Sequence, residues 1–226
     1  MKHKNKYHQS GFSLIELIIA MTVILVMLGA ASTLLFRAFG TRARESQRTD
    51  AIISAQAALD AMSREIANSG YGLETNGVVT ADSNAQRLHF RANVINDEIY
   101  QPGNSNNSNS SSSIITLKTD DPNEDITYYF DNSTQSILRY DRFANPATTV
   151  IVNQISDVKF DYFDYSGSTS AATPKVVPTN DTGRVTITVV VRLDPTAGQP
   201  NQLTNRTVTL KSDVTLRNSE YMRYQY

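Results

Sequence analysis

Apolar residues are concentrated in one stretch near the start of the chain, from Phe12 to Phe36. Nineteen of these 25 residues are apolar, and Glu16 is the one charged residue among them. A helix rises about 1.5 Å per residue, so about 20 residues cross the roughly 30 Å hydrocarbon core of a bilayer. The stretch is therefore long enough to span a membrane.

A cleaved secretory signal is the first alternative for this stretch. Such a signal needs a basic start, an apolar region of about 7 to 15 residues and a cleavage site of small residues. Cleavage after Ala31 would meet the last requirement. However, the apolar run continues to Phe36, and Glu16 lies where a signal should carry no charge. The pattern therefore favours an anchor that stays on the protein.

After Gly40 the apolar pattern becomes periodic. Apolar residues recur every three or four positions, at Ile52, Ala55, Leu59, Met62 and Ile66. This spacing predicts an amphipathic helix whose apolar face packs on a sheet. No proline falls in this region, so we expect one helix over residues 12–68, with bends allowed at Gly29 and Gly40, rather than two helices. We expect it to end at Ser69-Gly70, with Gly70 in the left-handed conformation.

Residues 71–226 show repeated alternation of apolar and polar positions, which is typical of antiparallel strands with one buried face. We expect strands at 87–92, 114–117, 126–130, 136–140, 150–152, 155–165, 185–193 and 208–216, with the third and fourth joined as a hairpin. Long surface loops are expected at 104–113 (ten consecutive Asn or Ser), 166–183 and 194–205. The expected fold class is α+β, with a long N-terminal helix packed by its second half on an antiparallel sheet.

The composition argues against several classes of function. The formal net charge is -1, from 21 basic and 22 acidic residues, which disfavours a strongly basic nucleic-acid binder. The chain has no cysteine, so disulfides and thiolate metal sites are excluded. Two of the three histidines, His3 and His8, lie in the N-terminal arm, which leaves His89 alone in the body. The sequence has no catalytic serine motif and no phosphate-binding glycine loop, so we expect no enzymatic activity and no cofactor.

The residues around Glu16 read Gly11-Phe12-Ser13-Leu14-Ile15-Glu16, after a short leader that carries Lys2, Lys4 and Lys6. With the apolar helix that follows, this segment resembles the processing site of type IV prepilins and type II secretion pseudopilins, over roughly residues 5–36. The resemblance implies that prepilin peptidase cuts after Gly11, that Phe12 becomes the N-methylated first residue, and that Glu16 is the assembly glutamate. It also implies three kinds of partner: other pilin or pseudopilin subunits, the peptidase/methyltransferase and inner-membrane lipid. No nucleic acid is expected.

The same resemblance divides the chain into a leader (1–11), a transmembrane helix (12–36), an amphipathic continuation (37–70) and a β-rich body (71–226). It implies a single-pass inner-membrane protein with its body on the periplasmic side, which enters a pilus or pseudopilus on assembly. Charge alone does not settle this orientation, because arginines after the helix balance the leader lysines: Arg37, Arg42, Arg44 and Arg48. Residues 58–73 and 210–218 are also similar to minor pseudopilins of the PulJ type and minor pilins of the PilW type.

Two alternatives to a filament subunit stay open at this point. One is a secreted binding module that has lost residues 1–31, and the other is a membrane-anchored adhesin that does not assemble. Removal of the leader would take three lysines and no acid, leaving 18 basic against 22 acidic residues and a net charge of -4. That charge does not favour DNA binding.

The acidic segment 120–125 contains a weak calcium candidate. Asp121, Asn123 and Asp125 have the first-third-fifth spacing of a calcium loop, but Ile126 stands where that loop needs glycine and Asn132 where it needs a bidentate carboxylate. We therefore expect no bound metal, and an acidic turn that leads into a strand. The aromatic residues of the strands are expected to pack across the sheet, and the lone His89 to be structural.

Overall fold

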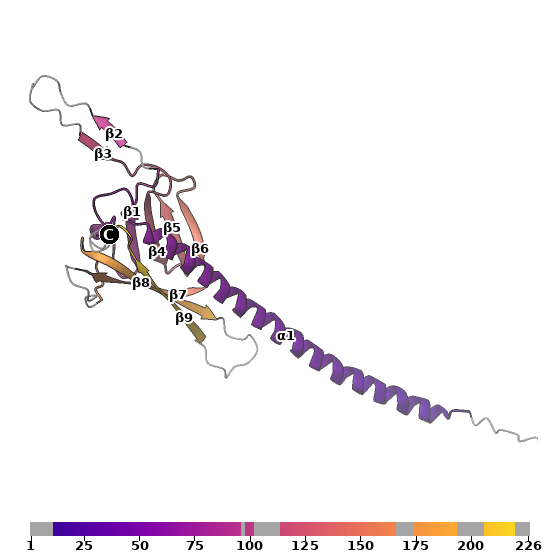
Figure 1. Cartoon of the computed structure of the whole chain (residues 1–226). Helices are drawn as coiled ribbons and strands as arrows, with labels where there is room; N and C mark the ends of the chain where they lie inside the picture. The colour runs from indigo at the N-terminus through magenta and orange to yellow at the C-terminus, as the bar shows by residue number, and fades with distance from the viewer. Residues whose placement is uncertain (1–10, 96–97, 102–113, 166–173, 194–205, 220–226) are drawn as a thin grey trace, which may run out of the picture. The chain divides into compact units, whose positions relative to one another are not determined.

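The computed structural model describes residues 11–95, 98–101, 114–165, 174–193 and 206–219. These residues form one α-helix, one short 3-10 helix and nine strands (Figure 1). The chain divides into two compact units, Met1–Gln47 and Arg48–Tyr226, and each is described by itself. The fold class is α+β, with one long apolar N-terminal helix and antiparallel sheets, which confirms the prediction.

Helix α1 runs from Leu14 to Ala67, which is 54 residues, without interruption at Gly29 or Gly40. Leucine, alanine and methionine favour helix, and no proline removes a backbone donor within it. The predicted end is also confirmed, because Gly70 adopts a φ of +77° shortly after the last helical residue. A Cβ atom on Gly70 would lie 2.4 Å from the carbonyl oxygen of Thr75, so the turn leaves no space for a side chain.

The second half of α1 contributes one face to the core of the Arg48–Tyr226 unit. The predicted residues Ala55, Leu59, Met62 and Ile66 are buried, together with Ala58, whereas Ile52 is half-buried. The five buried side chains form a single hydrophobic cluster with apolar residues of the strands. The expectation that this face packs on a sheet is therefore confirmed.

One sheet has four antiparallel strands in the order β1-β4-β5-β6. Its strands are β1 (Arg87–Arg91), β4 (Asp125–Asp131), β5 (Ser136–Asp141) and β6 (Thr148–Val152). Strands β4 and β5 form the predicted hairpin, with Tyr129 opposite Leu138. Tyr128 of β4 is buried and stacks with Phe90 of β1 at a centroid distance of 6.2 Å, which is cross-sheet aromatic packing as expected.

A second sheet has three antiparallel strands in the order β7-β8-β9. Its strands are β7 (Ile155–Asp164), β8 (Thr182–Leu193) and β9 (Arg206–Thr215). Alternate residues of β8 are completely buried, namely Val185, Ile187, Val189 and Val191. Burial thus alternates with the same two-residue period as the apolar residues in the sequence. The reason is that one face of this sheet packs against the core while the other face is exposed to water.

The structure adds elements and corrects a boundary. A small sheet pairs β2 (Glu98–Gln101) with β3 (Ile114–Leu117), and a 3-10 helix, η1, spans Thr80–Asp82. Strand β2 and η1 were not predicted, because neither carries a periodic apolar pattern. The predicted loop 166–183 was too long at its C-terminal end, because strand β8 already begins at Thr182. Thr182 pairs with Asp164 of β7, and this pairing has no apolar alternation in the sequence that could have predicted it. The predicted loops 104–113 and 194–205 lie outside the described residues, as does the first part of 166–183.

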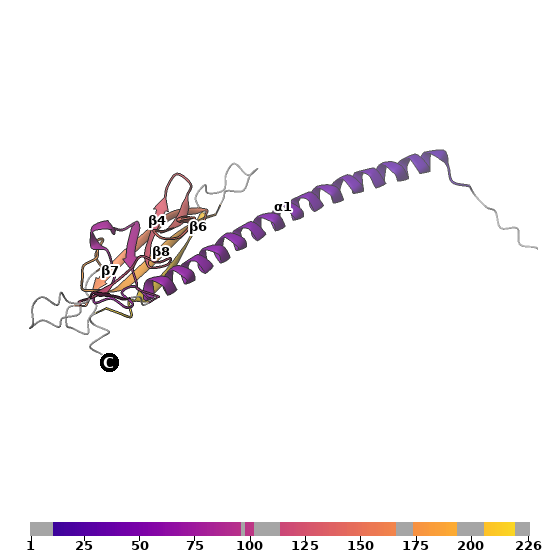
Figure 2. The same ribbon diagram turned by 90° about the horizontal axis from the view of Figure 1, so that it is seen from above.

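Figure 2 shows the C-terminal end of α1 beside the strands. Polar side-chain contacts also hold this end of the helix to both sheets. The Tyr128 hydroxyl donates to Oε2 of Glu65 at 2.6 Å, and Nε of Arg139 donates to the same oxygen at 3.0 Å. Burial first, and then the Glu65 carboxylate, raise the pKa of Tyr128, so its hydroxyl stays protonated and remains a donor. On the other sheet, Ser63 donates to Ser212 of β9 at 2.9 Å. These contacts orient the helix, while the apolar cluster supplies most of the stabilisation.

Replacing Met62 by alanine tests the buried face. Met62 is fully buried, so Met62→Ala should lower the free energy of unfolding by about 2–5 kcal/mol, through lost burial and a residual cavity. The matched control is Ile53→Ala on the same helix, where the side chain is 61% exposed and the expected loss is below about 0.5 kcal/mol. Urea unfolding followed by circular dichroism measures both values. Equal losses for the two variants would contradict the assignment of this face to the core.

Candidate functional site

The predicted processing segment lies at the start of α1. Gly11, Phe12 and Ser13 precede the helix, and the carbonyl oxygen of Ser13 accepts hydrogen bonds from the N–H groups of Glu16 (3.0 Å) and Leu17 (3.2 Å). Ser13 therefore occupies the N-cap position, where serine is favoured, and the sequence analysis had given it no role. The peptide bond after Gly11 thus lies in an exposed, non-helical segment immediately before the helix.

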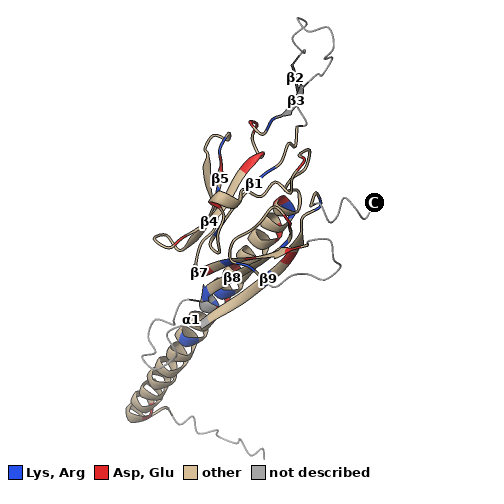
Figure 3. Cartoon of the chain, turned by 90° about the vertical axis from the view of Figure 1, so that its left-hand side faces the viewer, with Lys and Arg blue, Asp and Glu red and all other residues tan. Residues whose placement is uncertain are grey.

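Glu16 lies in the first turn of α1. The free N–H groups at a helix N-terminus carry partial positive charge, which stabilises a carboxylate at this position. Glu16 is exposed, and Figure 3 shows the N-terminal part of α1 drawn almost entirely in the colour of uncharged residues. Its carboxylate is thus the single acidic group within the apolar stretch Phe12–Phe36.

The surface of the first half of α1 is apolar on every side. Its large apolar side chains between Phe12 and Phe39 are 51% to 82% exposed, so the chain does not cover them itself. Thr22 and Thr33 donate their hydroxyl hydrogens to the carbonyl oxygens of Ile19 (2.8 Å) and Ala30 (2.7 Å), which satisfies these polar groups inside the helix. Among the described residues, α1 is the one helix long and apolar enough to cross a membrane.

Two of the three calcium candidates already contact other side chains in the described structure. Asp125 is almost fully buried, lies 2.6 Å from His89 Nε2 and accepts a hydrogen bond from Arg91 Nε at 3.0 Å. The side-chain oxygen of Asn123 accepts from Arg139 Nη2 at 2.7 Å. An ion bound by Asp121, Asn123 and Asp125 would have to displace His89, Arg91 and Arg139 from these oxygens.

Another acidic trio occupies the same loop. Asp120, Asp121 and Glu124 each place a carboxylate oxygen within 4.8 Å of the others. The buried Glu124 carboxylate accepts hydrogen bonds from the backbone N–H groups of Ile95 (3.0 Å) and Asp121 (3.2 Å). Through these hydrogen bonds, Glu124 connects the loop segment that contains Ile95 to the one that contains Asp121.

His89 joins three elements of the body. Its Nδ1 lies 2.9 Å from Oδ2 of Asp82 in η1, and its Nε2 contacts Asp125 at the start of β4. Burial acts to raise the pKa of Asp82, but hydrogen bonding and charge attraction from Arg87 and then His89 lower it overall. A carboxylate lies at each ring nitrogen, and these contacts include no nucleophile that the histidine could activate. His89 therefore has a structural role and connects η1 to the sheet.

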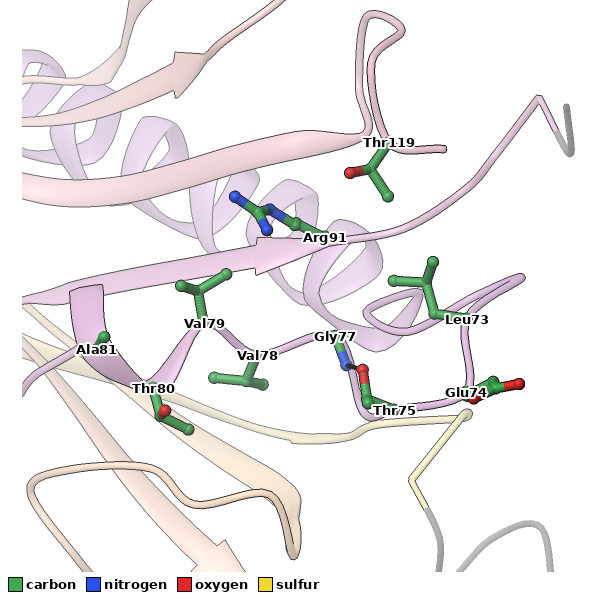
Figure 4. Close-up of a pocket in the computed structure, with 10 residues that line it drawn as sticks. All are labelled: Leu73, Glu74, Thr75, Gly77, Val78, Val79, Thr80, Ala81, Arg91 and Thr119. Atoms are coloured by element: carbon green, nitrogen blue, oxygen red, sulfur yellow. Dashed lines mark hydrogen bonds between the residues drawn. The ribbon is translucent and has the colours of Figure 1, made fainter. Parts of the chain in front are cut away.

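One described cavity lies beside this cluster (Figure 4). It has a volume of about 620 Å³ and is lined by Leu73, Glu74, Thr75, Gly77, Val78, Val79, Thr80, Ala81, Arg91 and Thr119. The lining includes one acidic and one basic side chain, and the guanidinium of Arg91 is already paired with Asp125 at 3.0 Å. These residues supply neither a nucleophile–base pair nor a convergent ligand set.

A family model for the prokaryotic N-terminal methylation motif matches residues 6–32 of this chain. The match supports a type IV pilin-like family, and with the apolar helix it is consistent with anchoring in a membrane. The matched range includes Gly11, Phe12 and Glu16, which the sequence analysis had singled out. No curated protein and no solved structure matches the chain significantly.

Acid should destabilise the body through Asp82 and Asp164. Burial acts to raise the pKa of Asp164, but hydrogen bonds from Lys175, Thr182 and Thr179 lower it below the ordinary value of 3.8. A carboxyl group with a lowered folded-state pKa stabilises the fold above its unfolded pKa, and this contribution is lost as the pH falls through the folded pKa. The free energy of unfolding should therefore fall below about pH 4.

Urea unfolding at a series of pH values measures this dependence. Asp164→Asn should reduce the difference in unfolding free energy between about pH 6 and about pH 3, because one titrating group is removed. Asp50→Asn, which removes an exposed carboxylate of α1, is the matched control, and we expect it to change the difference less than Asp164→Asn does. An unfolding free energy that stays constant over this range would contradict the assignment.

Proposed function

We propose that this chain is a minor pilin or pseudopilin, a non-enzymatic structural subunit of a type IV pilus or a type II secretion pseudopilus. The observation that carries the proposal is a helix with an apolar surface on every side that begins directly after a methylation motif. Before assembly, membrane lipid would cover this surface, and after assembly the apolar helices of neighbouring subunits would cover it. The body provides the outward-facing part of the subunit.

Processing and assembly use the same few residues in this proposal. Cleavage after Gly11 creates a free amine on Phe12, which is then methylated and keeps its positive charge. Inside a dry bundle of helices, the carboxylate of Glu16 requires a cationic partner, because an isolated charge there costs several kcal/mol. The amine of a neighbouring copy is such a partner, and the pair would fix the axial register between adjacent helices.

The partners follow from these steps. They are the prepilin peptidase and methyltransferase, inner-membrane lipid before assembly, and other pilin or pseudopilin subunits after it. We propose the periplasmic side for the β-rich body, because the motif precedes the helix and prepilin peptidase acts on the cytoplasmic side. The similarity of residues 58–73 and 210–218 to minor subunits of the PulJ and PilW types favours a minor subunit over the major subunit that forms most of the filament.

Mass spectrometry of the purified native chain tests the processing step. The mature protein should begin at N-methylated Phe12, and Gly11→Val should remain uncleaved. A side chain on Gly11 meets nothing within 4 Å, so failure of this variant would reflect recognition by the peptidase rather than misfolding. Gly29→Ala also meets nothing within 4 Å and, as the matched control, should be cleaved normally. An N-terminus at Ser32 would instead identify a secreted module.

Glu16→Ala tests the assembly step. The variant should stay in the membrane fraction but be lost from the filament fraction, because its helix has no charge to pair with the neighbouring amine. Glu45→Ala, which removes an exposed carboxylate farther along α1, is the matched control and should still assemble. Immunoblots of sheared filaments and membranes measure both. Normal incorporation of Glu16→Ala into filaments would contradict the role of Glu16 in assembly. Absence of the unmodified chain from the filament fraction would instead favour a membrane-anchored adhesin that does not assemble.

A further inference from the structure

A basic segment follows directly on the apolar stretch of α1. Residues 37–44 read Arg-Ala-Phe-Gly-Thr-Arg-Ala-Arg, with three arginines and no acidic residue. No charged residue lies between Glu16 and Arg37, and Figure 3 shows the uncharged N-terminal part of α1 giving way to basic positions. The segment is part of the same continuous helix and of the same compact unit as the apolar stretch. Its arginines therefore lie where the helix would leave a membrane.

The length of the uncharged interval places Arg37 at a bilayer surface. Arg37 follows Glu16 by 21 residues. At about 1.5 Å per residue these two positions are about 32 Å apart, which matches the roughly 30 Å thickness of the hydrocarbon core. A helix that holds Glu16 at one boundary of the core thus holds Arg37 at the other. Both charged groups then avoid the hydrocarbon, where either would be costly.

Arg42 lies within reach of the same surface. It is five residues beyond Arg37, or about 8 Å along the helix, and each headgroup layer is about 5–8 Å thick. Side chains on a helix lean toward its N-terminus, which here is the direction of the hydrocarbon core. Arg42 can therefore direct its guanidinium back into the headgroup layer that Arg37 enters.

Arg37 and Arg42 are also available to bind a ligand. Both side chains are exposed, and no ion pair or hydrogen bond of either guanidinium occurs among the residues that the structure describes. Phe36 and Phe39, which lie on either side of Arg37, are 79% and 60% exposed. Exposed arginines mixed with exposed apolar side chains are typical of a helix segment at the boundary between acyl chains and headgroups.

We propose that residues 37–44 bind the phosphate groups of anionic phospholipids where α1 leaves the membrane. Arginine suits this ligand, because its planar guanidinium donates several hydrogen bonds to phosphate oxygens and keeps its charge. A zwitterionic lipid offers the same phosphate, but its own cationic group reduces the attraction. Lipid is favoured over an acidic protein surface because Phe36 and Phe39 require an apolar environment at the same depth. The inference rests on the membrane anchoring in the proposed function, and not on processing or assembly.

Native mass spectrometry of the full-length chain in detergent tests the proposal, with an equal mixture of phosphatidylglycerol and phosphatidylcholine as the probe. The chain with one bound lipid should carry phosphatidylglycerol in excess. Because a basic residue near an anionic lipid surface changes binding about fivefold, Arg37→Gln/Arg42→Gln should lower the ratio of the two lipids by about an order of magnitude. The leader lysines are present in every variant, so the difference reports on the arginines.

Two further variants control for net charge and for the type of side chain. Lys211→Gln/Arg217→Gln removes the same charge from exposed positions of the body and should leave the lipid ratio unchanged. Arg37→Lys/Arg42→Lys keeps both charges and should retain most of the preference for phosphatidylglycerol. All substituted residues are exposed, so circular dichroism should show an unchanged fold.

Equal binding of the two lipids by the unmodified chain would overturn the proposal, and so would a preference that survives Arg37→Gln/Arg42→Gln. If the arginines instead contact acidic residues of neighbouring subunits, this variant would keep its lipid preference but be lost from the filament fraction. Flotation with vesicles of the same lipid mixture separates this inference from the proposed function. A chain that floats without a lipid preference overturns the headgroup site alone, whereas a chain that does not float contradicts the membrane anchor as well.

Discussion

The first half of α1 has an apolar surface that the protein itself cannot cover. Every backbone group inside a helix is satisfied, and the hydroxyls of Thr22 and Thr33 also bond to the helix, so this segment can leave water without losing hydrogen bonds. Burial of each large apolar side chain is worth about 1.5–3 kcal/mol relative to exposure. An apolar environment around this segment would therefore stabilise it, which is consistent with anchoring in a membrane.

The same helix changes its environment along its length without changing its backbone. Beyond residue 50, its apolar residues narrow to one face that includes Leu59 and Met62, and that face belongs to the core formed with the two sheets. Glu65 fixes the orientation of the helix on the sheet, because its carboxylate accepts hydrogen bonds from the Tyr128 hydroxyl of β4 and the Arg139 guanidinium of β5. One continuous helix thus contributes both the apolar segment, whose surface is consistent with anchoring in a membrane, and part of the core of the Arg48–Tyr226 unit.

The charged clusters of the body have a structural role. His89 lies between Asp82 and Asp125, Lys175 pairs with Asp164, and Glu124 accepts two backbone N–H groups. The first two clusters join a loop or short helix to a sheet, the third joins two loop segments, and the polar groups in these contacts satisfy one another.

The sequence alone determined the apolar helix, its length, the apolar face at residues 52–66, the end at Gly70 and most of the strands. Each of these depends on local periodicity or on the conformational freedom of one residue. The segment that matches the methylation motif was identified in the same way, because its residues are contiguous. The tertiary structure decided which polar residues meet, namely Glu65 with Arg139, and Asp125 with His89 and Arg91. It also decided which strands pair and which lie at the sheet edges, since pairing between residues distant in sequence leaves no periodic signal along the chain.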